Sequence, residues 1–182
     1  VLPMENDVKS PGVKDPLLWK KKARAFVTRT HQHLWGKNNQ DPMAFLFRRG
    51  LSLDFIRSMH LGWNKFGQER PFKNWGMDLD GSFVIPSGLV FPRIENKDLK
   101  SVYIIPMDGT GQIMLPGSDP SPMVLGGPEK SRVKETKDLL KGLARLQDAP
   151  QNTRIKILSQ NPGIGKKDSG NGPVRNQSDK GP

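Results

Sequence analysis

The sequence predicts an α+β fold, in which a small N-terminal helical subdomain packs on a short-stranded, mostly antiparallel sheet. Two observations support this class. Apolar residues recur at steps of three and four up to about residue 62, which is the helical period. From residue 82 to residue 126, short β-rich runs follow one another, separated by proline, glycine and aspartate.

The helical subdomain is expected to contain three helices between residues 15 and 62, after a flexible arm over residues 1–14. Asp15 is a suitable N-cap with proline at the first helical position, and the helical period then runs to about Trp35. A second helix starts at Asp41, and Ser52 caps a third one.

Four short runs predict the strands beside these helices, and together with the helices they form a domain over residues 15–127. The runs are Phe83–Ile85, Leu89–Phe91, Lys100–Ile105 and Gln112–Leu115. Residues 108–111 are expected to form a hairpin turn. Pro86 and Pro92 predict strand ends or edge positions, because proline cannot donate a ladder hydrogen bond.

After this domain, residues 128–150 are expected to form a basic amphipathic helix, with the helical pattern over 129–147. One side would hold the basic residues Lys130, Lys134, Lys137, Lys141 and Arg145. Leucine and valine would lie opposite. Residues 151–182 are predicted to be a disordered tail, apart from one brief strand over 154–158, because their composition cannot bury a core.

The charge of the chain limits its partners. Lysine and arginine number 29 against 18 acidic residues, a net charge of +11. The excess is +5 over residues 1–128 (17 minus 12) and +6 over residues 129–182 (12 minus 6). A positive charge spread in this way attracts polyanions such as nucleic acid, anionic membranes or acidic proteins.

Cysteine is absent, which excludes disulfides and cysteine-ligated zinc. The apolar runs are too short to span a bilayer, and the start lacks the pattern of a secretion signal, so we expect a cytoplasmic protein without a membrane span. The chain opens with Val1, and we therefore expect a fragment whose true beginning lies upstream.

Metal binding and catalysis are not expected from the residue patterns. His31 and His33 lie about 200° apart on a helix and cannot share a metal, while His60 is solitary. Asp78 and Asp80 lie in a turn that no strand precedes, so we expect a plain turn. The glycine-rich segment near Gly165 lacks the serine or threonine of a phosphate loop.

The basic residues of the first helix have two interpretations. Lys20–Lys22, with Arg24 and Arg29, either keep the helix soluble or contact phosphates. Only Asp15 offsets them locally, which favours phosphate. Trp19 and Trp35 are expected to be core residues rather than base-stacking platforms, because they follow the helical period.

Several segments, taken in order, resemble the family of the bacterial replicative DNA primase. They are Phe45–Leu51 with the pattern L-x-x-R-G-L, Phe55–Trp63 ending in L-G-W, Asn74–Gly76, Ile85–Pro92 with G-L-x-x-P, Leu115–Ser118 and Met123–Gly126. The resemblance covers residues 16–127. It implies the N-terminal part of the primase RNA polymerase domain, whose share is the handling of the template.

The resemblance also implies parts that this sequence lacks. The toprim catalytic subdomain, which holds magnesium through a glutamate and a D-x-D pair, should begin just after Gly127. We find no valine- or isoleucine-rich strand leading into a glutamate there, and the family's cysteine-rich zinc ribbon is absent. Ile104–Pro106 also replaces expected basic residues. We therefore expect no complete catalytic centre and no cofactor in this chain, which a truncation or frame change after Gly127 would explain.

The expected function is binding of single-stranded DNA during replication, with the cations arranged along a single track. The residues expected to contact DNA are Lys20, Lys21, Arg24, Arg48, Arg49, Arg93, Lys97, Lys100, Gly117 and Ser118. The family signature implies Arg49 and the glycine–serine turn; the other residues rest on charge and position. A replicative helicase or a separate catalytic subunit is a further partner that the resemblance implies.

Two alternatives remain open at this point. The chain could be a basic adaptor that binds an acidic protein or a membrane surface through the helix over 129–147. It could also be a decayed gene remnant without function, which the abrupt change after Gly127 permits.

Overall fold

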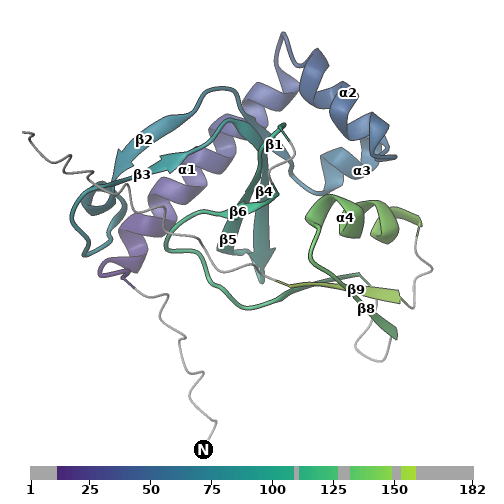
Figure 1. Ribbon diagram of the computed structural model, residues 1–182. Coiled ribbons are helices and arrows are strands. Elements are labelled where there is room, and N and C mark those ends of the chain that lie inside the picture. The colour runs from purple at the N-terminus through teal and green to yellow at the C-terminus, as the bar shows by residue number, and fades with distance from the viewer. Residues whose placement is uncertain (1–11, 109–110, 127–131, 149–152, 159–182) are drawn as a thin grey trace, which may run out of the picture.

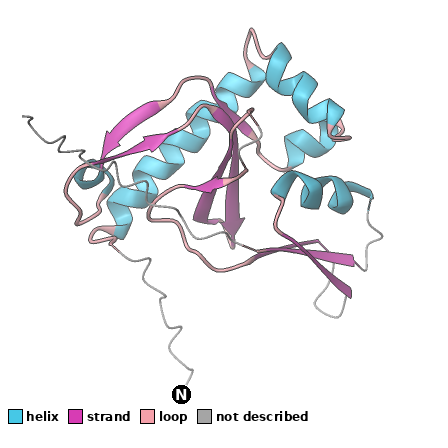
Figure 2. Ribbon diagram, in the orientation of Figure 1, coloured by secondary structure: helices cyan, strands magenta, loops and turns pink. Residues whose placement is uncertain are grey.

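The computed structural model describes residues 12–108, 111–126, 132–148 and 153–158. In these ranges the chain forms four α-helices, one 3₁₀ helix and nine strands, which confirms the predicted α+β class (Figure 1). The strands make a four-stranded, a two-stranded and a three-stranded sheet (Figure 2).

The three predicted helices of the N-terminal subdomain are present. They are α1 (Pro16–Trp35), α2 (Gln40–Arg48) and α3 (Leu53–Ser58). The Asp15 carboxylate accepts a hydrogen bond from the Leu18 amide at 2.9 Å, and Ser52 Oγ accepts one from the Phe55 amide at 3.3 Å. Both caps satisfy amides that the first helical turn leaves without a partner.

The central sheet has the order β1-β4-β5-β6, and every neighbouring pair is antiparallel. Its strands are β1 (Gly62–Asn64), β4 (Gly88–Glu95), β5 (Asp98–Ile105) and β6 (Ile113–Met114). β1 pairs only with residues 88–90 of β4, so Pro92 lies on a stretch of β4 that β1 does not reach. This is the edge position that the proline predicts.

A smaller antiparallel ribbon follows β1. It consists of β2 (Gln68–Pro71), the 3₁₀ helix η1 (Phe72–Trp75) and β3 (Ser82–Ile85). The sequence analysis did not predict β2, whose residues are polar. Asp78 and Asp80 lie in the loop between η1 and β3, and Asp80 pairs with Lys73 at 2.7 Å.

The third sheet corrects the predicted basic helix. Residues 132–136 form the strand β8 (Arg132–Thr136), and only the second half of the predicted helix is helical, as α4 (Leu139–Asp148). Asp138 caps α4 by accepting a hydrogen bond from the Lys141 amide at 3.0 Å, which fixes the helix start after the strand. Lys134 is therefore on a strand, and the predicted stripe of lysines on one helix face does not exist.

β8 pairs in parallel with β9 (Thr153–Ile157), which also pairs in antiparallel fashion with β7 (Met123–Gly126). The short strand expected over 154–158 within the predicted tail is thus confirmed. Residues 159–182 lie outside the described residues. β8, α4 and β9 together make a strand–helix–strand unit with parallel strands.

Part of the predicted arm is held on the domain. Val13 forms an isolated β-bridge with Met77, and the Lys14 amide donates a hydrogen bond to the Gly76 carbonyl at 2.8 Å. Residues 1–11 lie outside the described part of the chain.

The core has two halves, one on each face of the central sheet. α1 covers one face with Trp19, Ala23 and Phe26, which pack with Val90 and neighbouring sheet residues. On the other face, buried residues of the sheet pack with α2, α3 and α4. α1 therefore buries one side against the sheet and turns its other side outward, where its basic residues lie.

Candidate nucleic-acid interface

Five of the predicted contact residues gather where the first half of α1 meets the β4–β5 turn. The Lys20 ammonium lies 2.8 Å from Asp98 Oδ2, the Lys100 ammonium 3.4 Å from the same oxygen, and the Arg24 guanidinium 3.6 Å from Asp98 Oδ1. Lys21 follows Lys20 on α1 and is exposed. We call Lys20, Lys21, Arg24, Lys97, Asp98 and Lys100 the Asp98 cluster.

The β4–β5 turn brings the backbone of Lys97 to this cluster. Glu95 and Asp98 are paired across the hairpin, which leaves Asn96 and Lys97 as a two-residue loop. Both have left-handed backbones, with φ of 50° and 65°. Two consecutive left-handed residues are the geometry of a type I′ turn, which asparagine favours at its first position. The Lys97 carbonyl accepts a hydrogen bond from Arg24 at 3.3 Å, which fixes the turn against α1.

The charges of the cluster do not cancel. Three of the five cations in the cluster pair with its single carboxylate, and the cluster as a whole has an excess charge of +4. The hydrogen bond from Lys20, together with that from Lys100, holds the pKa of the Asp98 carboxyl below its usual value, although partial burial opposes the change. Lys21 and Lys97 have no carboxylate partner in the described part of the chain. Their field is therefore available to a polyanion.

Arg48 and Arg49 lie elsewhere, at the end of α2. Figure 1 shows α2 beyond the C-terminal end of α1, whereas the Asp98 cluster lies near its start. Since α1 has 20 residues, the two groups are separated by most of a helix about 30 Å long. The predicted residues therefore do not form one track.

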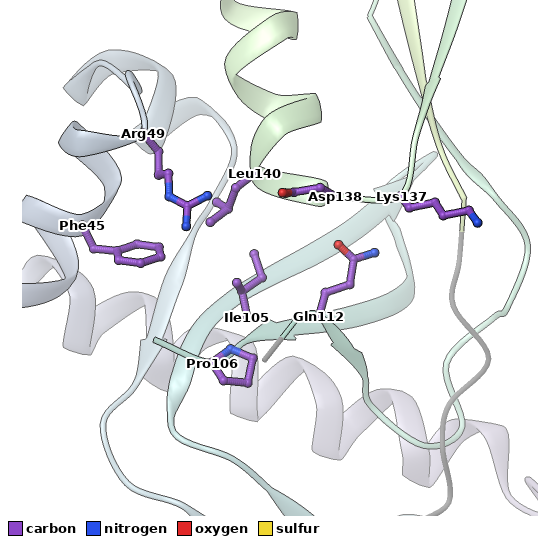
Figure 3. Close-up of a pocket in the computed structure, with 9 residues that line it drawn as sticks. Phe45, Arg49, Ile105, Pro106, Gln112, Lys137, Asp138 and Leu140 are labelled. Carbon is purple, nitrogen blue, oxygen red and sulfur yellow. The ribbon is translucent and has the colours of Figure 1, made fainter. Parts of the chain in front are cut away.

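Arg49 borders a hollow with a volume of about 200 Å³. Its guanidinium lies 5.0 Å from the centre of the Phe45 ring, and Ile105, Pro106 and Leu140 supply apolar walls. Figure 3 shows Arg49 and Asp138 directed toward the space between α2 and α4, while Lys137 points away from it. The hollow thus combines a cation and an aromatic ring with an apolar lining.

Three predicted contact residues are engaged inside the protein. The Arg93 side chain is only 7% exposed, and it binds Glu95 and the Ser121 carbonyl, both at 2.7 Å. Ser118 is buried, and its Oγ accepts a hydrogen bond from the Val102 amide at 3.1 Å. Gly117 lies so close to Trp19 that an added Cβ would be 2.3 Å from the indole Nε1. These residues hold the loop after β6 on the sheet.

The most informative residue that the sequence analysis missed is Asp98. Its two-residue turn could have been recognised from the β-rich runs on either side, but its partners on α1 lie more than seventy positions earlier. His60 also differs from expectation, because its ring lies 6.1 Å from that of His31 and is not solitary. In the ranges that the structure describes, no three potential metal-ligating side chains come together.

Comparison with protein-family models and with the curated proteins gives no match for this chain. The helices within the described ranges are too short or too polar to cross a membrane.

Proposed function

We propose that this protein binds single-stranded DNA, as the template-binding part of a primase-like replication protein. The observation that supports the proposal is the Asp98 cluster, in which α1 and the β4–β5 hairpin bring Lys20, Arg24 and Lys100 around one carboxylate, with the exposed Lys21 and Lys97 beside them in the chain. The shared carboxylate keeps Lys20, Arg24 and Lys100 close together, and a local excess of positive charge attracts the phosphates of a polynucleotide. The choice of single-stranded DNA among polyanions comes from the resemblance to primases.

In this proposal, DNA contacts two areas instead of one continuous track. The Asp98 cluster binds phosphates, and Arg49 contacts the same strand near the hollow at the far end of α1. Arg93, Gly117 and Ser118 are left out of the contact set, because their polar groups and surfaces are engaged within the domain.

The alternative function, a basic adaptor, depended on an accessible amphipathic helix over residues 129–147, and only the second half of that segment is helical. The apolar side of α4 is buried in the core through Leu139, Leu140 and Leu143. Both ends of this helix are also tied down: the Leu139 amide donates to Gln112 Oε1 at 2.8 Å, and the Gln147 side chain donates to the Gly50 carbonyl at 2.8 Å. A partner could reach only the polar side of α4.

The parallel unit extends the proposal in one respect. The sequence analysis found no valine- or isoleucine-rich strand leading into a glutamate after Gly127, yet β8 is a strand that includes Glu135 and leads into α4. The Glu135 carboxylate pairs with the Lys156 ammonium at 2.9 Å. We propose that β8, α4 and β9 are the beginning of the subdomain that the resemblance places there.

The test measures binding of a fluorescent oligothymidylate by anisotropy over a range of salt concentrations. For single strands, the log-log slope is about −0.7 for each neutralised phosphate. In the variant Lys21→Gln/Arg24→Gln, we expect weaker binding and a slope that is smaller by about 1.4, since two contacts are lost. Lys65→Gln/Lys134→Gln, which removes two exposed lysines from the β1–β2 loop and from β8, is the matched control and should change neither quantity. A flat titration of the unaltered protein would refute the proposal.

A further inference from the structure

Four side chains form a continuous row where the end of α1 meets the end of α3. The Arg57 guanidinium lies 5.1 Å from the centre of the Trp35 ring, the Trp35 ring 6.1 Å from that of His31, and the His31 ring 6.1 Å from that of His60. We call Arg57, Trp35, His31 and His60 the aromatic row. The ends of the row, Arg57 and His60, are exposed, and the two members between them are partly buried.

The inner members of the row are held in fixed positions. His31 Nδ1 donates a hydrogen bond to the Leu61 carbonyl at 2.9 Å, and since a carbonyl only accepts, this nitrogen carries the proton. His60 has a left-handed backbone, with φ of 53°, which directs its ring toward His31 at the turn after α3. The Trp35 indole N–H is buried and has no hydrogen-bond partner in the described ranges. Natural cores seldom leave such a donor unsatisfied.

The aromatic row lies on the same side of α1 as the Asp98 cluster. Lys20, Arg24, His31 and Trp35 are separated by four, seven and four residues, which is close to whole turns of an α-helix. His31 is seven residues beyond Arg24, so the row begins about 10 Å along the helix from the cluster. Cations thus lie at one end of this stripe and flat π-surfaces at the other.

We infer that the aromatic row stacks against nucleobases of a single strand whose phosphates lie on the Asp98 cluster. The inference rests on the proposed function and adds the site that receives the bases. The Arg57 guanidinium lies over the Trp35 ring and its side chain is 62% exposed, so a base can stack on it from the solvent side. The exposed His60 ring offers a second stacking surface, with His31 behind it.

Trp19 and Trp35 were both predicted to be core residues, and both pack against the core, but Trp35 is less buried than Trp19. Trp19 is 3% exposed and its indole N–H is bonded to the Pro116 carbonyl at 2.8 Å, so its position is fully explained by packing. Trp35 is only partly buried, and it lies beneath a guanidinium whose side chain is 62% exposed. An arginine laid over a tryptophan at a surface is a stacking arrangement that core packing does not require.

The experiment compares two oligonucleotides of equal length and charge, one of thymidylate and one whose sugars carry no bases. The test variant is Arg57→Gln/His60→Asn, because both side chains are exposed and asparagine tolerates a left-handed backbone. We expect about tenfold weaker binding of the thymidylate and unchanged binding of the abasic strand. Melting temperature, measured alongside, should match that of the unaltered protein.

A matched control is present on another surface. Phe66 is 66% exposed and has the Lys65 ammonium 5.3 Å from its ring centre, so Lys65→Gln/Phe66→Leu removes a similar pair elsewhere. This control should bind both strands as the unaltered protein does.

Trp35→Phe keeps a ring in the row but should abolish the quenching of tryptophan fluorescence that we expect thymidylate to cause in the unaltered protein.

The outcomes separate the inference from the proposed function. If Arg57→Gln/His60→Asn weakens both strands equally, the row contacts phosphate only, and if it weakens neither strand, the row is not in contact; either result overturns the inference. In both cases the loss of binding in Lys21→Gln/Arg24→Gln would still support the proposed function. If the unaltered protein binds neither strand, both proposals fail.

Discussion

Lys20 of α1 and Asp98 at the start of β5 form an ion pair of 2.8 Å across 78 positions of sequence. The pair joins the helix to the hairpin and draws Arg24 and Lys100 to the same carboxylate. It therefore has two effects, since it adds a contact between elements and it keeps like charges close together. The first three predictions examine these effects and the packing beside them.

Replacing Asp98 by asparagine should separate stability from binding. The side chain keeps its shape but loses its charge, so the cluster rises from +4 to +5. We expect tighter binding of single-stranded DNA at low salt, with the gain disappearing as salt rises. The free energy of unfolding should fall by no more than about 1 kcal/mol, because the pairs are near the surface. Weaker binding at low salt would mean that the geometry of the cluster matters more than its charge.

The same carboxylate predicts a dependence of stability on pH. Its pKa is lower in the folded protein than in the unfolded chain, where it is about 3.9. The stabilisation is therefore complete above that value and is lost as pH falls through the lower, folded value. In urea unfolding between pH 6 and pH 2, the difference between the unaltered protein and Asp98→Asn should be constant down to about pH 4 and then shrink. A constant difference throughout would contradict the assignment.

Gly117 should tolerate no side chain. Its φ is 86°, and an added Cβ would lie 2.3 Å from Trp19 Nε1, so Gly117→Ala combines a strained backbone with a displaced tryptophan. We expect a loss of about 2–5 kcal/mol in the free energy of unfolding. Gly81→Ala is the control, because its φ is 91° and nothing lies within 4 Å of the added atom; it should lose only about 1 kcal/mol. Equal losses would show that contact with Trp19 is unimportant.

α4 should behave as a core element. Leu143 is fully buried in the part of the core that α2, α3 and α4 form with the central sheet. Leu143→Ala should therefore lower the free energy of unfolding by about 2–5 kcal/mol. Lys141→Ala, on the exposed side of the same helix, should change it by less than about 0.5 kcal/mol. Thermal or urea unfolding measures both. A small effect of Leu143→Ala would restore the view of α4 as a free interaction helix.

The parts of the fold that the sequence predicts are those governed by local signals. Asp15, Pro16 and the apolar period define α1, and the short β-rich runs define β4 and β5, because each signal lies within or next to the element that it predicts. β8 was mistaken for helix because Lys134, Lys137 and Lys141 also fit steps of three and four. What decides in favour of the strand is pairing with β9, about twenty residues later. Pairing between strands that are distant in the sequence produces no periodic pattern of residues.

The candidate site was predictable only in its charge. Basic residues could be selected by their number and position, and three of them, Lys20, Arg24 and Lys100, do converge on Asp98. Burial of Arg93 beside Glu95, and the use of the Ser118 hydroxyl by Val102, depend on how the loop after β6 returns to the sheet. The aromatic row likewise joins α1 to the turn after α3, and no motif links His31 to His60.

The place of β9 at the centre of its sheet, between β7 and β8, has a consequence for how the protein is made. Of the three strands, β9 is the last to leave the ribosome, so neither β7 nor β8 can pair in this sheet before β9 has been synthesised. At usual rates of synthesis, the 35 residues from Met123 to Ile157 take about 2–7 s. Between the synthesis of α4 and that of β9, the nascent chain exposes the leucines of α4. If translation stopped before residue 153, β9 would be missing and the leucines of α4 would stay exposed. Proteases and chaperones recognise such exposed apolar segments.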